Sequence, residues 1–261
     1  MNIIEAAIYG LVQGLTEFLP ISSSGHLVLY RAAIDSEGAA APLFYSVLVH
    51  VASLLAILIV FRREAIRLLG RDRRLGVYII LATVPAVIAG LLFYGLIERV
   101  LSSPMPVAFA LTFTGTVLVA GELIARRRAG AKFAERELGL GSAMSVGFAQ
   151  AIALLPGVSR SGMTISAGRA LGLNRDASVR FAFLLAIPAL AGAGAYEALN
   201  MLRDGVAAGV EFGPAAAAFL VSLISSWIAL VLLIRIVRRV GLWVFAPYCF
   251  AVAAIAFIWL S

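Results

Sequence analysis

The stretch QGLTEFLPISSSGH, residues 13–26, interrupts the first apolar segment of the chain with a glutamate, three serines and a histidine. A second stretch, QAIALLPGVSRSGMT, residues 150–164, interrupts a later apolar segment in the same way and adds an arginine. Ionisable groups at bilayer depth cost free energy, about 3 kcal/mol per charge on insertion scales. They therefore face a protein interior, a water-filled cavity or a substrate, so Glu17, His26 and Arg160 mark the expected functional region.

The composition around these stretches is that of a membrane protein. Of the 261 residues, 62% are hydrophobic and 13% are charged, whereas soluble domains are about half apolar and about a quarter charged. Long apolar blocks predict membrane-spanning α-helices rather than the short alternating segments of a β-barrel. The single cysteine, Cys249, excludes an internal disulfide framework and a cysteine-rich metal site.

Six uninterrupted apolar stretches are long enough to cross a bilayer, which requires about 20 residues. They are residues 42–61, 75–97, 105–125, 177–201, 212–234 and 241–260. Two further apolar stretches, 2–34 and 141–171, are broken by proline, glycine and serine, and neither half of either stretch is long enough to cross. Proline and glycine end helices, and irregular backbone at membrane depth requires cover by protein or water. We therefore expect two re-entrant helix–loop–helix hairpins.

The two hairpins are related by a constant shift of 137 positions, as from Gly10 to Gly147. The same shift carries Gln13, Ser22, Ser24 and Gly25 onto Gln150, Ser159, Ser161 and Gly162. The order of broken and unbroken segments also matches, which predicts one transmembrane domain with repeat 1 at about 1–125, a basic linker at about 126–138 and repeat 2 at about 139–261. Three spans per copy is an odd number, so the second copy must enter the membrane from the opposite side. The predicted fold is an all-α polytopic membrane protein with an inverted-topology repeat.

Basic residues are concentrated on one side of this predicted topology. The side that holds loop 62–74 also receives the arginines and the lysine of 126–136, 169–180 and 235–239, whereas the opposite side receives only Arg31, Arg99 and Arg203. The positive-inside rule makes the arginine-rich side cytoplasmic and both termini extracytoplasmic. The net charge of +7 then reflects topology and contact with anionic lipid headgroups rather than nucleic-acid binding. A specific lipid role for the arginine-rich loops is the minor alternative.

The polar residues of the two hairpins suit a phosphate-type anion. Gln13 and Glu17 are four positions apart and share one helix face. Ser22, Ser23 and Ser24 stand at the start of a half-helix, where free N–H groups and the helix dipole favour anions. The second hairpin has the same form with Arg160 at its tip, and a guanidinium binds phosphate oxygens bidentately. If the tips meet at mid-membrane, the carboxylate could hold a divalent cation or act as a base.

Structural interpretations of these residues stay open beside the functional one. Ser22, Ser24, Ser159 and Ser161 could simply cap half-helices. Glu17 and Arg160 could form a buried structural ion pair, and His26 could be an interior histidine with satisfied hydrogen bonds. For the remaining polar or helix-breaking positions we expect a structural role at His50, interface contact for Glu122 and Glu197 near span ends, and kinks at Pro85 and Pro188.

Together the two motifs resemble the bacterial undecaprenyl-pyrophosphate phosphatases linked to bacitracin resistance. The first motif of that family is a glutamate or glutamine, three residues and a glutamate, followed by a serine-rich turn that ends in Gly-His; here it is Gln13, Glu17 and FLPISSSGH. The second motif is PGxSRSxxT, here Pro156, Gly157, Ser159, Arg160, Ser161 and Thr164. The resemblance spans nearly the whole chain. Gln13 occupies a position that is often glutamate, which weakens any scheme in which two carboxylates share a metal.

The resemblance implies a multi-pass enzyme of the bacterial plasma membrane that hydrolyses undecaprenyl pyrophosphate to undecaprenyl phosphate, which recycles the lipid carrier for peptidoglycan synthesis. It also implies a divalent cation, Mg²⁺ or Ca²⁺, held by Glu17 with Gln13, and a site that opens to the extracytoplasmic side. Arg160 would act on the pyrophosphate and His26 as acid or base, while the attacking group would be Ser23 or an activated water. The expected substrate-binding residues are Ser22, Ser24, Gly25, Gly157, Ser159, Ser161 and Thr164.

A competing class of function is a carrier or flippase for an anionic lipid phosphate, because inverted repeats with broken helices are also the architecture of many secondary transporters. The density of acid, base and hydroxyl groups within ten residues of the first hairpin favours the enzyme. A purely structural scaffold does not explain an arginine inside the second hairpin. The sequence leaves open the prenyl chain length, the identity of the cation and whether the protein forms a homodimer.

Overall fold

The structure of the protein is a computed structural model that describes residues 1–33, 43–93, 95–97, 104–127, 134, 137–203 and 211–260. The elements in this part of the chain are helices. In chain order they are α1 (Ile3–Phe18), α2 (Ser23–Ala33), α3 (Leu43–Val60), α4 (Arg62–Leu68), α5 (Arg73–Leu92), α7 (Pro104–Arg127), α8 (Leu140–Ile152), α9 (Arg160–Ala170), α10 (Arg175–Arg203), α11 (Phe212–Arg239), the short 3₁₀ helix η2 (Leu242–Phe245) and α12 (Ala246–Leu260).

The six predicted spans are confirmed as helices. Five segments are long and apolar enough to cross a membrane, namely α5, α7, α10, α11 and the pair formed by η2 and α12. The sixth, α3, passes the same test together with α4, from which it is bent by 83°. The predicted bounds differ by more than two residues in two places, because α5 ends at Leu92 rather than at 97 and α11 continues to Arg239 rather than ending at 234. The basic loop after α3 also contains a helix, α4, that the sequence analysis did not predict.

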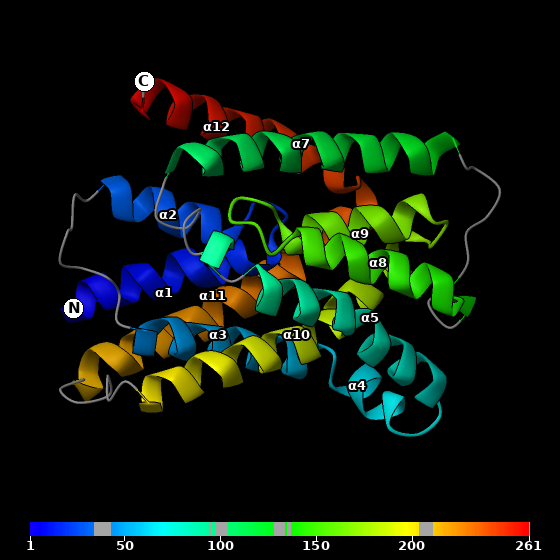
Figure 1. Ribbon diagram of the computed structural model, residues 1–261, viewed down its shortest axis with the longest axis horizontal. Helices are drawn as coiled ribbons and strands as arrows, with labels where there is room; N and C mark the ends of the chain where they lie inside the picture. Colours follow the sequence, from blue (N-terminus) through cyan, green and yellow to red (C-terminus); the bar gives the residue numbers. More distant parts are fainter. Residues whose placement is uncertain are drawn as a thin grey trace.

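Both broken segments fold as the predicted hairpins. In the first, α1 ends at Phe18, just before Pro20, and α2 begins at Ser23. In the second, α8 ends at Ile152 and α9 begins at Arg160. Figure 1 shows that α1 and α2 enter from the end of the molecule where the N-terminus lies, whereas α8 and α9 enter from the opposite end. The hairpins therefore have the opposite orientations that an inverted-topology repeat requires.

The packing of the two hairpins repeats as well. Helix α1 packs against α11, and its counterpart α8 packs against α5. Gly10 of α1 lies so close to α11 that a Cβ there would be 2.4 Å from the carbonyl oxygen of Ala218. Gly147 of α8, at the equivalent position, lies so close to α5 that a Cβ would be 2.2 Å from the carbonyl oxygen of Ala82. Small residues let helices approach closely in membrane proteins, so the glycine pair of the sequence repeat fixes equivalent helix contacts.

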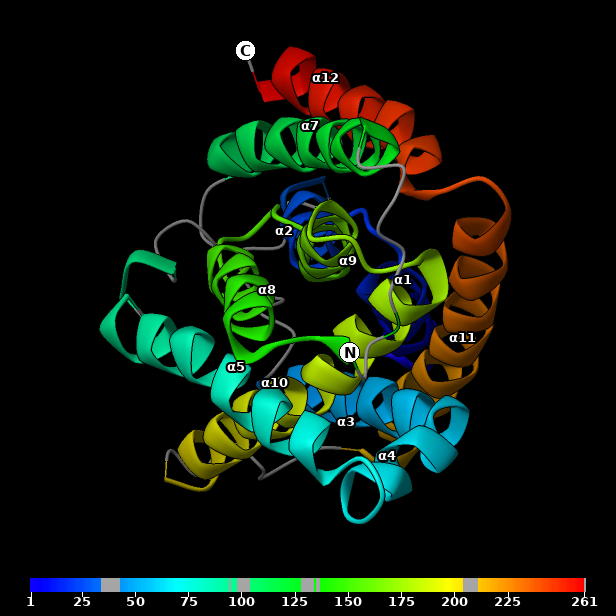
Figure 2. The ribbon, with the colours of Figure 1, turned by 90° about the vertical axis from the view of Figure 1, so that its right-hand side faces the viewer.

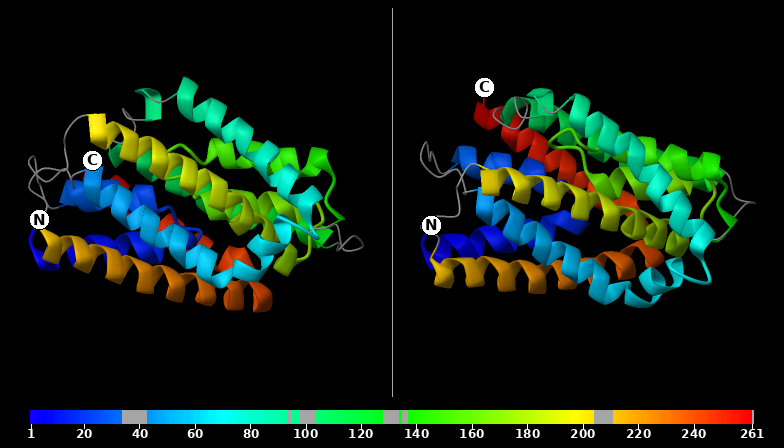
Figure 3. Two further views of the ribbon diagram at one scale, coloured as in Figure 1. Left: turned by 90° about the horizontal axis from the view of Figure 1, so that it is seen from below. Right: turned by 60° about the horizontal axis from the view of Figure 1, so that its bottom comes forward.

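The second half-helix of each hairpin lies inside the bundle. In the end-on view α2 and α9 are near the centre, α7 and α12 cover one side, α11 and α5 stand on opposite flanks, and α3 and α10 close the remaining side (Figure 2). The long helices run along the long axis of the bundle, and the beginning of α1 and the end of α12 lie at the same end (Figure 3). Aromatic packing of Phe183 with Phe18 and Phe61 anchors the end of α1 next to the first hairpin turn.

The structure shows the surroundings of residues outside the two motifs for which a structural or interface role is expected. His50 bonds the carbonyl oxygen of Ser46 in its own helix through Nδ1, as a structural histidine would. Glu122 does not reach the interface as expected; it is buried because Arg126 and Arg175 pair with its carboxylate. Pro85 and Pro188 lie inside α5 and α10. Arg99 and most of the predicted linker, residues 128–133 and 135–136, lie outside the described residues.

Candidate active site

The tips of the two hairpins meet near the middle of the long axis (Figure 1). Arg160, the first residue of α9, donates a hydrogen bond through a terminal nitrogen to Oε1 of Glu17, near the end of α1. The backbones approach closely at the same place, because a Cβ on Gly25 would lie 3.0 Å from the Cα of Gly157. The sequence predicts a shared site only if the two hairpin tips meet, and in the structure they do.

Glu17 is the residue on which the polar groups converge. While its Oε1 atom accepts from Arg160, its Oε2 atom accepts a 2.8 Å hydrogen bond from Nε2 of Gln13 and a 2.7 Å bond from Oγ of Ser23. The residue is 8% exposed and Gln13 is fully buried. A buried carboxylate costs free energy unless it is paired and hydrogen-bonded, and these three partners meet that requirement. The structure thus brings four of the predicted residues into direct contact.

Local chain geometry explains this arrangement. Gln13 and Glu17 lie on one face of α1 because they are four positions apart. The helix ends at Phe18 and Pro20 redirects the chain, so that Ser23, the first residue of α2, returns to the Glu17 carboxylate. Ser22 between them has φ of 68°, a left-handed conformation that is uncommon outside glycine. Such an outlier is often found at functional sites, and here it sets the direction in which Ser23 enters the half-helix.

The two half-helices begin with equivalent hydrogen bonds. In the first hairpin Oγ of Ser22 accepts from the backbone N–H of Gly25 and lies 3.3 Å from Oγ of Ser24. In the second hairpin Oγ of Ser159 accepts from the N–H of Gly162 and lies 3.2 Å from Oγ of Ser161. The capping role is therefore confirmed for Ser22 and Ser159. Two helix N-termini, each with its positive dipole end, face the same region.

The second tip is held by Thr114 of α7, which the sequence analysis did not single out. Its hydroxyl donates a 3.0 Å bond to the carbonyl oxygen of Gly157 and accepts a 3.0 Å bond from the N–H of Ser159. Gly157 has φ of +90°, which favours glycine, and a Cβ there would lie 2.6 Å from the side chain of Ala110. Thr164, expected to touch substrate, is buried and bonds the carbonyl oxygen of Arg160. Thr114 and Thr164 thus shape the turn that presents Arg160.

His26 occupies a neighbouring position rather than the centre of the cluster. Its Nδ1 atom lies 2.7 Å from the carbonyl oxygen of Ser22, and its Nε2 atom lies 2.8 Å from the hydroxyl of Tyr248 in α12. A carbonyl oxygen can only accept, so Nδ1 carries the proton and the Nε2 lone pair of the neutral ring accepts from Tyr248. Among the described residues no hydrogen bond joins His26 to Glu17, Ser23 or Arg160. The lone pair that could accept a proton is therefore oriented by Tyr248.

The sequence pattern does not mark Thr114 or Tyr248 as residues of the site. Each lies in an apolar span far from both motifs, and each reaches the site only through tertiary packing. A hydroxyl in an otherwise apolar helix was the only available signal, and that signal is shared by many positions of this chain. The two residues that hold the tips in place are thus visible only in the fold.

The geometry of Ser23 and Glu17 is that of a nucleophile and its base. A serine hydroxyl becomes an effective nucleophile when a base lies within hydrogen-bond reach, about 2.6–3.2 Å. The Ser23 hydroxyl donates to Glu17 over 2.7 Å and is partly accessible, while Arg160 adds the positive charge that a transferring phosphoryl group requires. A hydroxyl, a carboxylate and a guanidinium in this arrangement are the groups that attack on a phosphate ester or anhydride requires.

The residues present fit a divalent cation only when a ligand completes the site. Among the described residues, no three side chains of histidine, cysteine, aspartate or glutamate come together. One feature nevertheless suits a hard cation, because Oε1 of Gln13 is buried beside Glu17 and has no hydrogen-bond partner. Magnesium is commonly bound by one or two protein oxygens together with substrate phosphates and water. Gln13 and Glu17 supply such a pair of oxygen donors.

The chain matches proteins of one family along its length. The model of the family described as bacitracin resistance protein BacA matches residues 6–255. A protein of Alcanivorax borkumensis named undecaprenyl-diphosphatase is 36% identical over 275 residues, which cover 100% of both chains. Proteins with the same name from Rubrobacter xylanophilus and Methanobrevibacter smithii are 36% and 35% identical, and each alignment covers 98% of this chain and 97% of the relative.

Proposed function

Because the chain belongs to the bacitracin resistance protein BacA family, we propose that it hydrolyses undecaprenyl pyrophosphate to undecaprenyl phosphate and inorganic phosphate. Relatives that align over its whole length carry the name undecaprenyl-diphosphatase. The observation that carries the proposal is the contact of Ser23 with Glu17 beside Arg160, since it joins a nucleophile, a base and a phosphate-binding cation. The reaction recycles the lipid carrier used for peptidoglycan synthesis.

Substrate binding follows from the charges at the hairpin tips. The diphosphate takes the place next to Arg160, whose planar fork can hold two phosphate oxygens. The N–H groups at the starts of α2 and α9 add dipolar stabilisation, and the hydroxyls of Ser24 and Ser161 stand beside them. Oε1 of Glu17 stays next to the guanidinium of Arg160, while Oε2 accepts the hydrogen bond from Ser23.

The first chemical step transfers the terminal phosphoryl group to Ser23. Glu17 accepts the proton of the Ser23 hydroxyl as Oγ attacks the terminal phosphorus, and the bond from that phosphorus to the bridging oxygen breaks. Undecaprenyl phosphate leaves with the electron pair of that bond. In the second step water attacks the phosphoserine, the water proton passes to His26, and the serine oxygen leaves with the proton held by Glu17. Inorganic phosphate is the second product, and both residues return to their starting states when His26 releases its proton.

A divalent cation, Mg²⁺ or Ca²⁺, is part of the proposal. Gln13, through its unpartnered Oε1 atom, and Glu17 would hold it together with oxygens of the diphosphate. When bound, the cation neutralises charge that develops on the phosphate oxygens. The chain's own contribution is to keep the Gln13 amide oxygen buried and oriented by the hydrogen bond from Nε2 to Glu17.

The proposed location is the bacterial plasma membrane, with both termini and the opening of the site on the extracytoplasmic side. Segments that are rich in arginine in the sequence, among them α4, the end of α7 and the start of α10, lie at the end of the bundle opposite the beginning of α1 (Figure 1), and the positive-inside rule assigns that end to the cytoplasm. Fusions of alkaline phosphatase and of green fluorescent protein to the C-terminus test this orientation in cells. Active phosphatase and dark fluorescent protein support the proposal, and the reverse pattern rejects it.

The experiment that tests the function measures both products of the reaction. Purified protein in detergent is incubated with undecaprenyl pyrophosphate and Mg²⁺ or Ca²⁺, with and without EDTA, and released phosphate is compared with undecaprenyl phosphate identified by mass spectrometry. Equal amounts of the two products from wild type, and their loss in Ser23→Ala protein, support the proposal. Folded wild-type protein that releases no phosphate with any cation rejects it.

A second candidate function is lipid-phosphate transport without hydrolysis. The observation that favours it is the entry of the two hairpins from opposite ends (Figure 1), which is the arrangement of many carriers that work by alternating access. The two functions separate in proteoliposomes loaded with fluorescent prenyl phosphate. Transfer of the lipid between leaflets by wild-type protein that releases no phosphate would identify a carrier, whereas phosphate release without such transfer identifies the phosphatase.

A further inference from the structure

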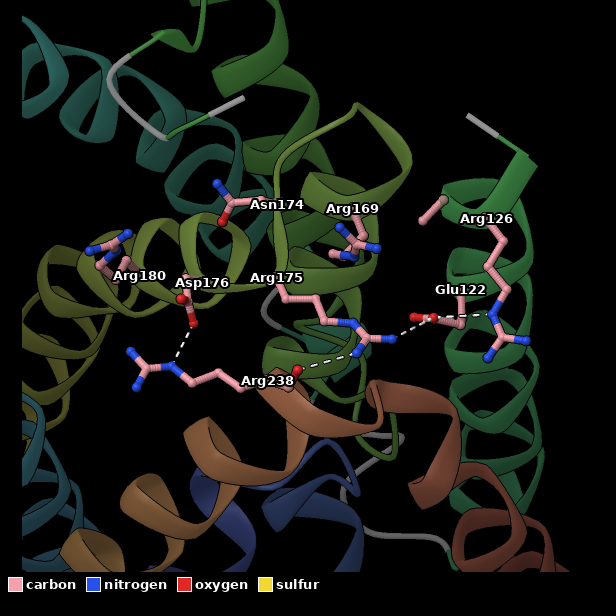
Figure 4. Close-up of a pocket in the computed structure, with 9 residues that line it drawn as sticks. Glu122, Arg126, Arg169, Asn174, Arg175, Asp176, Arg180 and Arg238 are labelled. Atoms are coloured by element: carbon pink, nitrogen blue, oxygen red, sulfur yellow. Dashed lines mark hydrogen bonds and ion pairs between the residues drawn. The ribbon is translucent and has the colours of Figure 1, made fainter. Parts of the chain in front are cut away.

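A cavity of about 770 Å³ lies at the arginine-rich end of the bundle, away from the hairpin tips. It is open to the outside and lies between the last turns of α7 and α11, the end of α9 and the start of α10 (Figure 4). Its size falls within the range of small-molecule sites, about 300–1,000 Å³. Five arginines, two carboxylates and an asparagine make up nearly all of its lining.

The positive charge of the cavity exceeds what its own carboxylates neutralise. Glu122 accepts from Arg126 over 3.3 Å and from Arg175 over 3.1 Å, and Asp176 accepts from Arg238 over 2.6 Å. Even without Arg180, the four guanidinium groups of Arg126, Arg169, Arg175 and Arg238 against two carboxylates leave a formal excess of two positive charges in the lining. Like charges brought together cost free energy unless a counter-charge is present, so the cavity as a whole favours an anion.

Arg175 lines the cavity, and four hydrogen bonds hold its guanidinium in place. Its NH1 atom donates to the carbonyl oxygens of Arg238 and Arg239, and its NH2 atom donates to the carbonyl oxygen of Val240 and to Glu122. The guanidinium thereby caps the last carbonyls of α11 and ties three helices together (Figure 4). Arg175 therefore joins the helix ends on which most of the described lining of the cavity lies.

The other arginines retain donors for a ligand. Arg126 and Arg238 each use only Nε in the ion pairs described, and among the described residues their terminal nitrogens have no other hydrogen-bond partner. Arg169 donates from NH1 to the carbonyl oxygen of Leu173, but its buried Nε atom has no partner. A buried donor without a partner is destabilising, so a ligand oxygen at this position would be stabilising.

We propose that this cavity binds a phosphate group, either as inorganic phosphate or as the headgroup of a phosphate-bearing lipid. Guanidinium forks match the geometry of phosphate oxygens and carry a permanent charge. The site is distinct from the hairpin tips, because Arg160 and Arg169 begin and nearly end the same helix, α9. Nine residues of helix separate their Cα atoms by about 14 Å. The proposal rests on the cavity alone and holds whether or not the hairpin site hydrolyses its substrate.

The test measures phosphate binding to full-length Arg160→Ala protein, so that the hairpin site contributes little to the signal. One arm uses equilibrium dialysis with radiolabelled inorganic phosphate in detergent. The other arm uses native mass spectrometry with phosphatidic acid, with phosphatidylcholine as the zwitterionic comparison. Binding in the first arm alone identifies free phosphate, binding in the second alone identifies a lipid headgroup, and binding in both identifies the phosphate group itself as the feature recognised.

Variants of the lining decide whether the cavity is the site. The double change Arg126→Gln and Arg169→Gln lowers affinity at least tenfold, whereas Arg71→Gln, an exposed arginine at the same end, leaves it within twofold. Asp176→Asn frees Arg238 from its partner and raises affinity about threefold. The absence of binding in both arms overturns the proposal, as does equal loss in the Arg71 variant. If the double variant does not fold, an unchanged affinity in Asp176→Asn protein overturns it.

Discussion

Glu17 and Arg160 form an ion pair between the tips of two hairpins that lie 143 positions apart in the chain. Glu17 ends a half-helix that enters from one end of the bundle, and Arg160 begins a half-helix that enters from the other (Figure 1). The carboxylate also holds the Ser23 hydroxyl. Neither half of the chain therefore contains the whole of the proposed site, because Glu17 and Ser23 come from the first hairpin and Arg160 comes from the second.

We predict that Ser23 carries the phosphoryl group during turnover. Wild-type protein incubated briefly with substrate labelled at the terminal phosphate, then quenched in acid, retains the label on a peptide that contains Ser23. Ser23→Ala protein retains none, and its rate falls by at least about 10³-fold because the nucleophile is lost. The matched control is Ser145→Ala, which removes an exposed hydroxyl that bonds only its own helix. Normal turnover by the Ser23 variant would assign the attack to water.

Tyr248→Phe tests the orientation of His26. The change removes the hydroxyl that lies 2.8 Å from Nε2 while keeping the ring stacked beside the imidazole. A hydrogen bond contributes about 1 kcal/mol net, so we expect kcat to fall between about fivefold and tenfold, with KM nearly unchanged. Tyr78→Phe, in which the lost hydroxyl bonds Arg74, is the control. An unchanged rate in the Tyr248 variant would exclude this contact from the catalytic cycle.

Thr114→Val should destabilise the second hairpin tip. The hydroxyl satisfies both the carbonyl oxygen of Gly157 and the N–H of Ser159, and each buried group left unpaired costs about 1–3 kcal/mol. We expect the free energy of unfolding in detergent to fall by at least about 2 kcal/mol, together with weaker substrate binding. Thr116→Val is the control on the same helix, since Thr116 is exposed and bonds only Thr112. Equal stability of the two variants would contradict the bridging role of Thr114.

The repeat predicts paired effects at two glycines. Gly10→Ala places a methyl group 2.4 Å from a neighbouring carbonyl oxygen, and Gly147→Ala places one 2.2 Å from another. Overpacking of this kind costs about 1–3 kcal/mol. Both variants should therefore unfold at lower denaturant concentration than wild type. Gly192→Ala in α10, with nothing within 4 Å of the new methyl, should be neutral or slightly stabilising. A loss at only one of the two glycines would mean that the repeat-related contacts are not equivalent.

Much of this architecture follows from local pattern. Apolar length predicts the spans, and proline, glycine and serine in the interior of two apolar segments predict the hairpins. The four-residue spacing of Gln13 and Glu17 predicts that they share one helix face, and in the structure a 2.8 Å hydrogen bond joins them. The shift from Gly10 to Gly147 also predicts equivalent environments, and both residues pack against a helix backbone.

The sequence pattern does not show which residues become neighbours in the folded protein. Thr114 and Tyr248 lie in apolar spans, and only the packing of α7 and α12 on the hairpins brings them to the site. Glu122 lies near a span end, which is typical of an interface residue, yet it is buried and pairs with Arg175 at the start of α10. The arginines interpreted as topology signals likewise converge on one cavity because four separate helix ends meet there.

We predict that the two repeats complete one phosphatase site. The most direct test measures phosphate release from undecaprenyl pyrophosphate by wild-type, Glu17→Gln and Arg160→Ala protein. Glu64→Gln and Arg71→Gln are the charge-matched controls, and folding of each variant is checked by its unfolding transition in detergent. We predict release by wild type and both controls, and a decrease of at least about 10³-fold in both site variants. Release within tenfold of wild type by either folded site variant would contradict the claim.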